Sequence, residues 1–202
     1  MAITIHLSSV VTMAKKKKEV DLNDNTKRLV DEDEMDEMGE GVLGSVYSLE
    51  SFSTTDGPGI CMAFFLQGCP KRCLFFCNPK TQALADPKKH PKFALSSGEV
   101  ALLVGKYQEW LFPCGGSITI LGGEPLIQAS FVSDVFKRVQ SLGLTTCLDT
   151  ACHGDKVIWK EVLPHIDNIL LCLNGMDNKV TGRVARVPIG KMAKSKAFAC
   201  FV

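Results

Sequence analysis

Apolar residues between Val42 and Leu173 follow two patterns: short continuous runs, and runs in which apolar positions recur every three or four residues. A continuous run of four to eight apolar residues is typical of a buried strand. The sequence therefore predicts strands at Val42–Leu49, Ile60–Leu66, Ser117–Leu121, Thr145–Asp149 and Asn168–Leu173. The spaced runs predict a helix from Ser97, a helix with Phe131, Val135 and Val139 on one stripe, a short helix over Lys156–Leu163 and a last helix over 189–201.

These elements alternate as strand and helix from Ile60 onward. Such alternation is typical of parallel strands joined by helices that pack outside them, so we expect an α/β barrel or part of one. The residues 53–59, Ser-Thr-Thr-Asp-Gly-Pro-Gly, predict a tight turn, and residues 78–97 predict a loop. Functional residues in this architecture lie at the carboxyl ends of the strands.

Composition and charge narrow the class of protein. The chain has 202 residues, of which 46% are apolar and 22% charged, which excludes wholesale disorder and collagen-like repeats. No run of about 18 apolar residues occurs, so we expect no membrane-spanning helix. The net charge of +1 gives no support to nucleic-acid binding.

Charge is unevenly distributed along the chain. Residues 1–40 hold 6 basic and 10 acidic residues, a net charge of −4, whereas residues 41–202 hold 17 and 12, a net charge of +5. Blocks of like charge repel one another and bury little surface. We therefore predict a charged, disordered tail over 1–41 and one domain over 42–202. The tail lacks a convincing targeting signal, which predicts a cytoplasmic protein, with plastid or mitochondrion as alternatives.

Three of the nine cysteines lie close together, at Cys69, Cys73 and Cys77. Pro70, Lys71 and Arg72 stand between the first two, which is too polar for a buried core segment. Three thiolates in a short loop can hold three irons of a 4Fe-4S cluster and leave the fourth iron open. A zinc site is the second interpretation, because zinc prefers four ligands and pairs spaced by two residues. Unrelated core thiols are the third.

Two further motifs follow predicted strands. Gly122-Gly123-Glu124-Pro125 offers exposed backbone and one carboxylate after the strand Ser117–Leu121, although an ordinary strand-to-helix turn has the same composition. Asp149 and Thr150 end the next strand, where an aspartate can also serve as a helix cap. These motifs and the cysteines are expected to meet at one edge of the sheet.

Several segments resemble pyruvate formate-lyase activating enzymes, a branch of the radical S-adenosylmethionine (SAM) superfamily. The resemblance covers about residues 42–175. Its segments are 44–52, Thr55–Ile60, Phe65–Leu74, Asn78-Pro79, Ile118–Gln128 and Thr145–Thr150.

The resemblance implies a partial (β/α)6 barrel, here truncated to about four βα units. It also implies a 4Fe-4S cluster and SAM as cofactors. One electron from the cluster cleaves SAM, and the resulting radical removes a hydrogen from a glycine of a glycyl radical enzyme such as pyruvate formate-lyase. An electron donor such as flavodoxin or ferredoxin is the second implied partner. Neither nucleic acid nor a membrane is expected.

The resemblance also implies roles for individual residues. Cys69 and Cys73 match iron ligands, and Cys77 is expected to supply the third thiolate. Phe75 matches an aromatic residue beside the adenine. The Asp56–Gly59 turn matches a segment near the glycine-bearing loop of the partner. The residues expected to contact SAM are Phe75, Phe76, Gly122, Gly123, Glu124, Asp149, Thr150, Cys172 and Asn174.

The chain departs from the family pattern in four respects. Phe76 stands where the family has its third cysteine, and Cys77 is displaced by one position. Ala151-Cys152-His153 replaces the second half of an Asp-Thr-Asn-Gly-like segment. Cys172-Leu-Asn174 replaces Asp-Leu-Lys, and the sequence stops after the fourth predicted helix begins. The sequence therefore supports two hypotheses: an activating enzyme, and a truncated non-catalytic paralogue with a defective cluster site.

Overall fold

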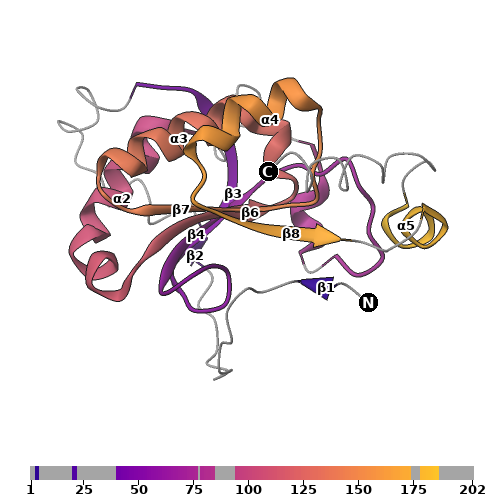
Figure 1. Ribbon diagram of the computed structural model, residues 1–202, viewed down its shortest axis with the longest axis horizontal. Helices are drawn as coiled ribbons and strands as arrows, with labels where there is room; N and C mark the ends of the chain where they lie inside the picture. The colour runs from indigo at the N-terminus through magenta and orange to yellow at the C-terminus, as the bar shows by residue number, and fades with distance from the viewer. Residues whose placement is uncertain are drawn as a thin grey trace.

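The computed structural model describes residues 3–4, 20–21, 40–76, 78–84, 94–173 and 178–186. Its centre is a mixed sheet flanked by helices (Figure 1). The strands are β1 (Ile3–Thr4), β2 (Val20–Asp21), β3 (Leu43–Ser53), β4 (Cys61–Leu66), β5 (Ala94–Ser96), β6 (Ser117–Gly122), β7 (Thr145–Thr150) and β8 (Asn168–Leu173). The helices are α2 (Ser97–Leu111), α3 (Ala129–Ser141), α4 (Lys156–Val162) and α5 (Asn178–Ala185), with 3-10 turns η1 (Pro79–Gln82), η3 (Phe112–Cys114), η4 (Pro125–Gln128) and η5 (Leu163–His165).

Four parallel strands form the middle of the sheet, in the order β8-β7-β6-β4. Helix α2 lies between β4 and β6 in the chain, α3 between β6 and β7, and α4 between β7 and β8. The predicted α/β architecture of about four βα units is confirmed. The sheet is open, as a partial barrel requires. Strand β3 runs antiparallel to β4. The two strands are joined by a tight turn, whereas parallel strands would need a crossover helix.

The core lies between the sheet and the helices α2, α3 and α4, which share one side of the sheet in Figure 1. Phe64, Ile120 and Leu148 pack there against the α3 residues Phe131 and Phe136, and all five side chains are buried. Successive strand residues point to opposite faces of a sheet. The residues that alternate with this core set, among them Thr119 and Asp149, therefore face the side away from these helices.

Several boundaries differ from the sequence predictions. Strand β3 extends to Ser53, and the segment 78–97 contains η1 and β5 in addition to loop. Helix α2 has Ser96 as its cap: the Ser96 Oγ accepts from the Glu99 amide at 3.0 Å, and Glu99 Oε2 accepts from the Ser96 amide at 2.6 Å. Both orphan amides are satisfied by this capping box, which fixes the start of the helix.

Helix α5 was not predicted, because it has only eight residues, most of them polar. The helix predicted over 189–201 lies outside the described residues. Most of the predicted tail 1–41 also lies outside them. The described parts of the tail are β1, β2 and residues 40–41. Strand β1 pairs with β8, and β2 pairs with β3. The division at residue 41 stays a prediction. Within the described ranges, no helix is long and apolar enough to cross a bilayer.

Candidate functional site

The cysteine loop, residues 67–76, leaves the carboxyl end of β4 and crosses the ends of the neighbouring strands. The Gly68 amide donates to the Thr81 carbonyl at 2.7 Å, which ties the start of the loop to η1. Farther along, the Arg72 amide donates to the Ala185 carbonyl at 3.0 Å, and the Leu74 amide to the Val184 carbonyl at 3.0 Å. The loop is therefore held at one end by η1 and at the other by α5.

The glycine pair at the end of β6 allows this loop to approach closely. The Gly123 amide donates to the Leu66 carbonyl at 3.0 Å, and the Glu124 amide to the Gly68 carbonyl at 2.8 Å. A Cβ atom on Gly123 would lie 1.9 Å from the Gly68 carbonyl oxygen, and Gly122 has a φ of +114°. Both positions therefore require glycine for backbone packing. Their contact with a cofactor stays a prediction.

Glu124 is sealed beneath the loop. Its side chain is 1% exposed. Oε1 accepts from the Thr150 hydroxyl at 2.5 Å and from the Leu126 amide at 3.2 Å, and Oε2 accepts from the Ala151 amide at 3.0 Å. Burial raises the pKa of Glu124, while these hydrogen bonds and the charge of Lys71 oppose the rise. The carboxylate thus joins the ends of β6 and β7.

Lys71 is a site residue that the sequence predictions missed. Its Nζ donates to the Ala151 carbonyl at 2.8 Å, so the cysteine loop is anchored over the end of β7. Its charge also opposes the rise in the thiol pKa of Cys69 and of Cys73. A lysine in a polar loop is usually solvated, and its place between two cysteines was the one available signal.

The two described cysteines of the loop are shielded from solvent. Cys69 is 3% exposed and Cys73 is half-buried. Burial raises the pKa of both thiols, and the neighbouring Cys73 adds to the rise at Cys69. Cys77 lies outside the described residues. Across the described ranges, no three His, Cys, Asp or Glu side chains could hold a metal ion, so these residues build no mononuclear zinc site.

The remaining predicted residues lie on β7, on β8 and in the loop. Asp149 is on the face away from the helices, where burial and the charges of Glu124 and Asp56 raise its pKa to about 7. Cys172, half-buried on β8, has its pKa raised to about 11 by burial and by Asp149. Phe75 is partly exposed and Phe76 half-buried. Asn174 lies outside the described residues.

These residues fit an iron–sulfur cluster by the chemistry of their donors. Cys69 and Cys73 bring two thiols to the carboxyl edge of the sheet, and Cys172 brings a third to the end of β8. Lys71 supplies a positive charge that favours thiolates in this half-buried region. Thiolates are the ligands that hold iron–sulfur clusters.

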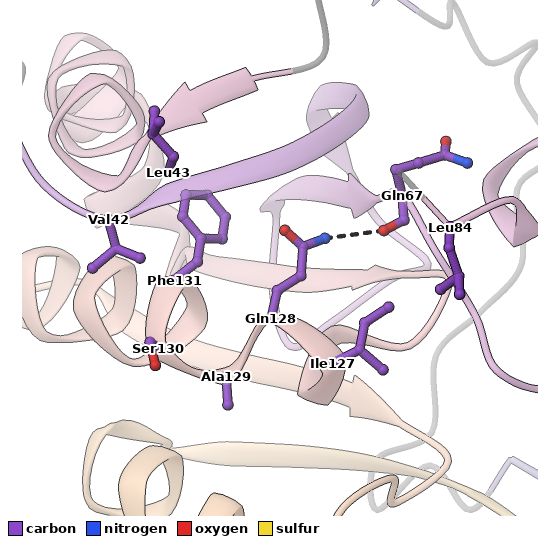
Figure 2. Close-up of a pocket in the computed structure, with 9 residues that line it drawn as sticks. All are labelled: Val42, Leu43, Gln67, Leu84, Ile127, Gln128, Ala129, Ser130 and Phe131. Carbon is purple, nitrogen blue, oxygen red and sulfur yellow. Dashed lines mark hydrogen bonds between the residues drawn. The ribbon is translucent and has the colours of Figure 1, made fainter. Parts of the chain in front are cut away.

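Gln128 is a second site-supporting residue that the sequence predictions did not assign. Its side-chain Nε2 donates to the backbone carbonyl of Gln67 at 3.0 Å, as Figure 2 shows, and to that of Ser45 at 3.1 Å. Its Oε1 accepts from the backbone amide of Ser45 at 2.7 Å. It therefore fastens the start of the cysteine loop to β3. A groove of about 480 Å³ beside it is lined by none of the predicted site residues, but by Val42, Leu43, Gln67, Leu84, Ile127, Gln128, Ala129, Ser130 and Phe131.

A family model described as a 4Fe-4S single cluster domain matches residues 55–179 of the chain. The chain is 35% identical over 150 residues to the pyruvate formate-lyase-activating enzyme of Staphylococcus epidermidis, which covers 69% of the chain and 58% of the relative. The proteins of the same name from Staphylococcus aureus strains USA300 and COL are 34% identical over the same shares. The chain thus spans about 58% of the length of these relatives. The resemblance predicted from the sequence motifs is confirmed.

Proposed function

Because the chain belongs to the family of 4Fe-4S single cluster domains, we propose that it is a radical SAM activating enzyme. Its substrate would be a glycine residue of a glycyl radical enzyme such as pyruvate formate-lyase. One observation carries the proposal. Three segments that match the family, around Cys69, Glu124 and Thr150, meet in one hydrogen-bonded unit at the carboxyl edge of the parallel strands.

In this proposal Cys69 and Cys73 hold the cluster. When bound and reduced, the cluster supplies the electron that cleaves SAM. The protein's part is to position the reactants and to exclude water from them. Glu124 and Lys71 would keep the cysteine loop in register with the ends of β6 and β7. The backbone of Gly122 and Gly123, packed against this loop, would meet the amino group of SAM.

Further contacts with SAM are proposed for residues along the same edge. Phe75 would lie against the adenine, and Phe76 beside it would also contact SAM. Asp149 and Thr150 would meet the polar part of SAM from β7. Because burial leaves Asp149 with a pKa of about 7, its charge would depend on pH in the physiological range.

Two macromolecular partners belong to the proposal. The Asp56–Gly59 turn lies just before β4 and would contact the glycine-bearing loop of the partner enzyme. Ser53 Oγ donates to the Asp56 carboxylate at 2.5 Å, so the turn has a defined shape before any partner binds. A flavodoxin or a ferredoxin would deliver the electron. The cytoplasm is the proposed location, with plastid and mitochondrion as the alternatives.

The test is anaerobic reconstitution of the full chain with iron and sulfide, followed by iron counting and electron paramagnetic resonance (EPR). We expect a reduced 4Fe-4S signal that changes when SAM is added. Dithionite and SAM should then yield 5′-deoxyadenosine. Adding a pyruvate formate-lyase should give a glycyl radical signal. A cluster that neither responds to SAM nor cleaves it would refute the proposal.

A matched pair of variants separates ligand loss from general damage. Cys69→Ser removes a buried thiol of the loop, whereas Cys114→Ser removes an exposed thiol of η3. We expect the first variant to lose the cluster and the second to retain it. Equal iron contents in the two variants would contradict the role of Cys69.

The second candidate function is a non-catalytic paralogue. It is favoured by the environment of Glu124, since both carboxylate oxygens already accept hydrogen bonds from the protein. Phe76, which cannot ligate iron, favours it as well. A reconstituted cluster without 5′-deoxyadenosine formation is the result expected for this candidate.

A further inference from the structure

The face of β8 that carries Cys172 is defined by the pairing of β8 with β7. Leu148 pairs with Ile169, and both belong to or pack against the core on the helix side. Asp149 pairs with Leu170, which therefore lies on the opposite face. Cys172 is two residues beyond Leu170 and shares that face with Asp149. Its thiol consequently points away from the helices α2, α3 and α4.

The path of the cysteine loop brings Cys73 to the same end of the sheet. Gly68 contacts the end of β6 through the Glu124 amide. Lys71 reaches the carbonyl of Ala151, directly after β7. Arg72 and Leu74, on either side of Cys73, bond to the end of α5, the helix that follows β8. The loop thus crosses the ends of β6 and β7. Ala151 directly follows Thr150, which pairs with Leu171, so Lys71 brings the loop beside the strand end that carries Cys172.

The electrostatics of the thiols agree with this path. The pKa of Cys172 is raised to about 11, first by burial and Asp149, and further by Cys73 and Glu124. Lys71 opposes the rise at Cys172, as it does at Cys69 and Cys73. The pKa of Cys69 is in turn raised by Cys73. The charge of Lys71 therefore acts on all three thiols, and Cys73 acts on both Cys69 and Cys172.

Three thiols are a ligand set that suits a 4Fe-4S cluster, because each thiolate binds a different iron and the fourth iron stays open. Cys69, Cys73 and Cys172 supply three thiols at the carboxyl edge of the parallel strands.

We propose that Cys172 is a ligand of the iron–sulfur cluster, together with Cys69 and Cys73. One thiolate would then come from a rigid strand, and two from the loop. Each bond forms between a cysteine sulfur and an iron, and each thiol releases its proton to solvent. Cys172 would in this way take the place of third ligand, which Phe76 cannot fill and which the resemblance led us to expect of Cys77. The proposal rests on the proposed function only in assuming that the chain holds a cluster.

The test is Cys172→Ser in the full chain, reconstituted anaerobically beside wild type and Cys114→Ser. We expect Cys172→Ser to lose at least about half of its iron on gel filtration and to change the EPR spectrum of what remains. Cys114→Ser, which removes an exposed thiol of η3, should match wild type. Wild-type iron content and EPR spectrum in Cys172→Ser would overturn the proposal.

A rescue variant distinguishes a lost ligand from a damaged fold. Phe76→Cys restores a thiol at the position where the family has one, so Phe76→Cys combined with Cys172→Ser should regain wild-type iron content. Loss of iron that this second substitution does not restore would overturn the proposal as well.

The outcomes also separate this proposal from the proposed function. A wild-type chain that takes up no cluster would refute the proposed function itself. A wild-type chain that takes up a cluster insensitive to Cys172→Ser would refute only the role of Cys172.

Discussion

Lys71 sets the charge around the thiols of the cysteine loop. Its ammonium group donates to the Ala151 carbonyl and lowers the pKa of Cys69 and of Cys73 against the effect of burial. Replacing it with methionine should raise both thiol pKa values, so a smaller fraction of each thiol is ionised at a given pH. Because the thiolate is the reactive form, alkylation should slow, by about tenfold for each unit of pKa.

Alkylation by iodoacetamide at pH 8, followed peptide by peptide in a mass spectrometer, measures this effect for Cys73 in the apo-protein. Lys71→Arg keeps the charge and should react at nearly the wild-type rate. Cys114 in the same samples serves as an internal reference, since it is exposed and lies on η3. Equal rates for Cys73 in wild type and in Lys71→Met would show that the charge has no influence on the thiols.

Asp149 gives the folded chain a pH dependence of opposite sign to that of a salt-bridged carboxylate. Burial, with the charges of Glu124 and Asp56, raises its pKa from 3.8 to about 7. Below pH 3.8 both folded and unfolded chains hold the proton. Between 3.8 and about 7 the unfolded chain releases it while the folded chain keeps it. The free energy of unfolding contributed by Asp149 therefore falls as pH rises through this window, by up to about 4 kcal/mol.

Urea unfolding of wild type and Asp149→Asn between pH 4 and pH 8 isolates this contribution. The asparagine variant cannot ionise, so its stability relative to wild type should increase with pH until about pH 7 and then stay constant. A stability difference that does not vary with pH would mean that Asp149 ionises normally in the folded chain.

At the scale of elements, the contact between β6 and the cysteine loop depends on the absence of a side chain at Gly123. A Cβ atom there would meet the Gly68 carbonyl oxygen at 1.9 Å, and backbone cannot yield as a side chain would. Gly123→Ala should therefore destabilise the chain by at least about 3 kcal/mol in urea unfolding and lower iron retention.

Gly105 is the matched control for this substitution. It lies within α2, and a Cβ atom there would meet nothing within 4 Å. Gly105→Ala should stabilise the chain by about 1 kcal/mol, because alanine has the higher helix propensity. Loss of stability in both variants, or in neither, would contradict the packing role assigned to Gly123.

The elements with strong apolar patterns were those that the sequence predicted best. All four parallel strands and the buried stripe of α3 are as expected, because continuous runs and three-to-four spacing follow directly from burial on one side. The short polar helix α5 and the strand β5 were missed, since tertiary hydrogen bonds stabilise them more than local pattern does. The sequence also predicted correctly that the segments around Cys69, Glu124 and Thr150 meet at one edge of the sheet.

The network within that site was beyond the reach of the sequence. Lys71 and Ala151 are 80 residues apart in the sequence, and Ser45 and Gln128 are 83 apart. Such pairs are set by strand order. The position of Cys172 relative to the cysteine loop also depends on strand order. The resemblance had assigned this residue to SAM binding. Long-range contacts of this kind need the register of the whole sheet.

At the scale of the whole molecule, a cluster held by Cys69, Cys73 and Cys172 would link the loop after β4 to β8, on the far side of the parallel strands. The ligands converge only in the folded chain, so cluster binding adds to the stability of that state. With free cluster components about 100-fold above their dissociation constant, the gain is about 2.7 kcal/mol, or roughly 5–10 °C in the unfolding midpoint.

Anaerobic thermal unfolding followed by circular dichroism tests this linkage in the full chain. The reconstituted wild type should unfold several degrees above the apo-protein and should lose the gain when chelator and oxidant remove the iron. Without the cluster, Cys172→Ser and wild type should unfold at the same temperature, because the half-buried thiol contributes little packing. On reconstitution, the unfolding temperature of Cys172→Ser should rise by less than that of wild type. If the unfolding temperature of Cys172→Ser rises as much as that of wild type, the loop alone holds the cluster. Cys172 on β8 is then not a ligand and adds nothing to the stability of the reconstituted chain.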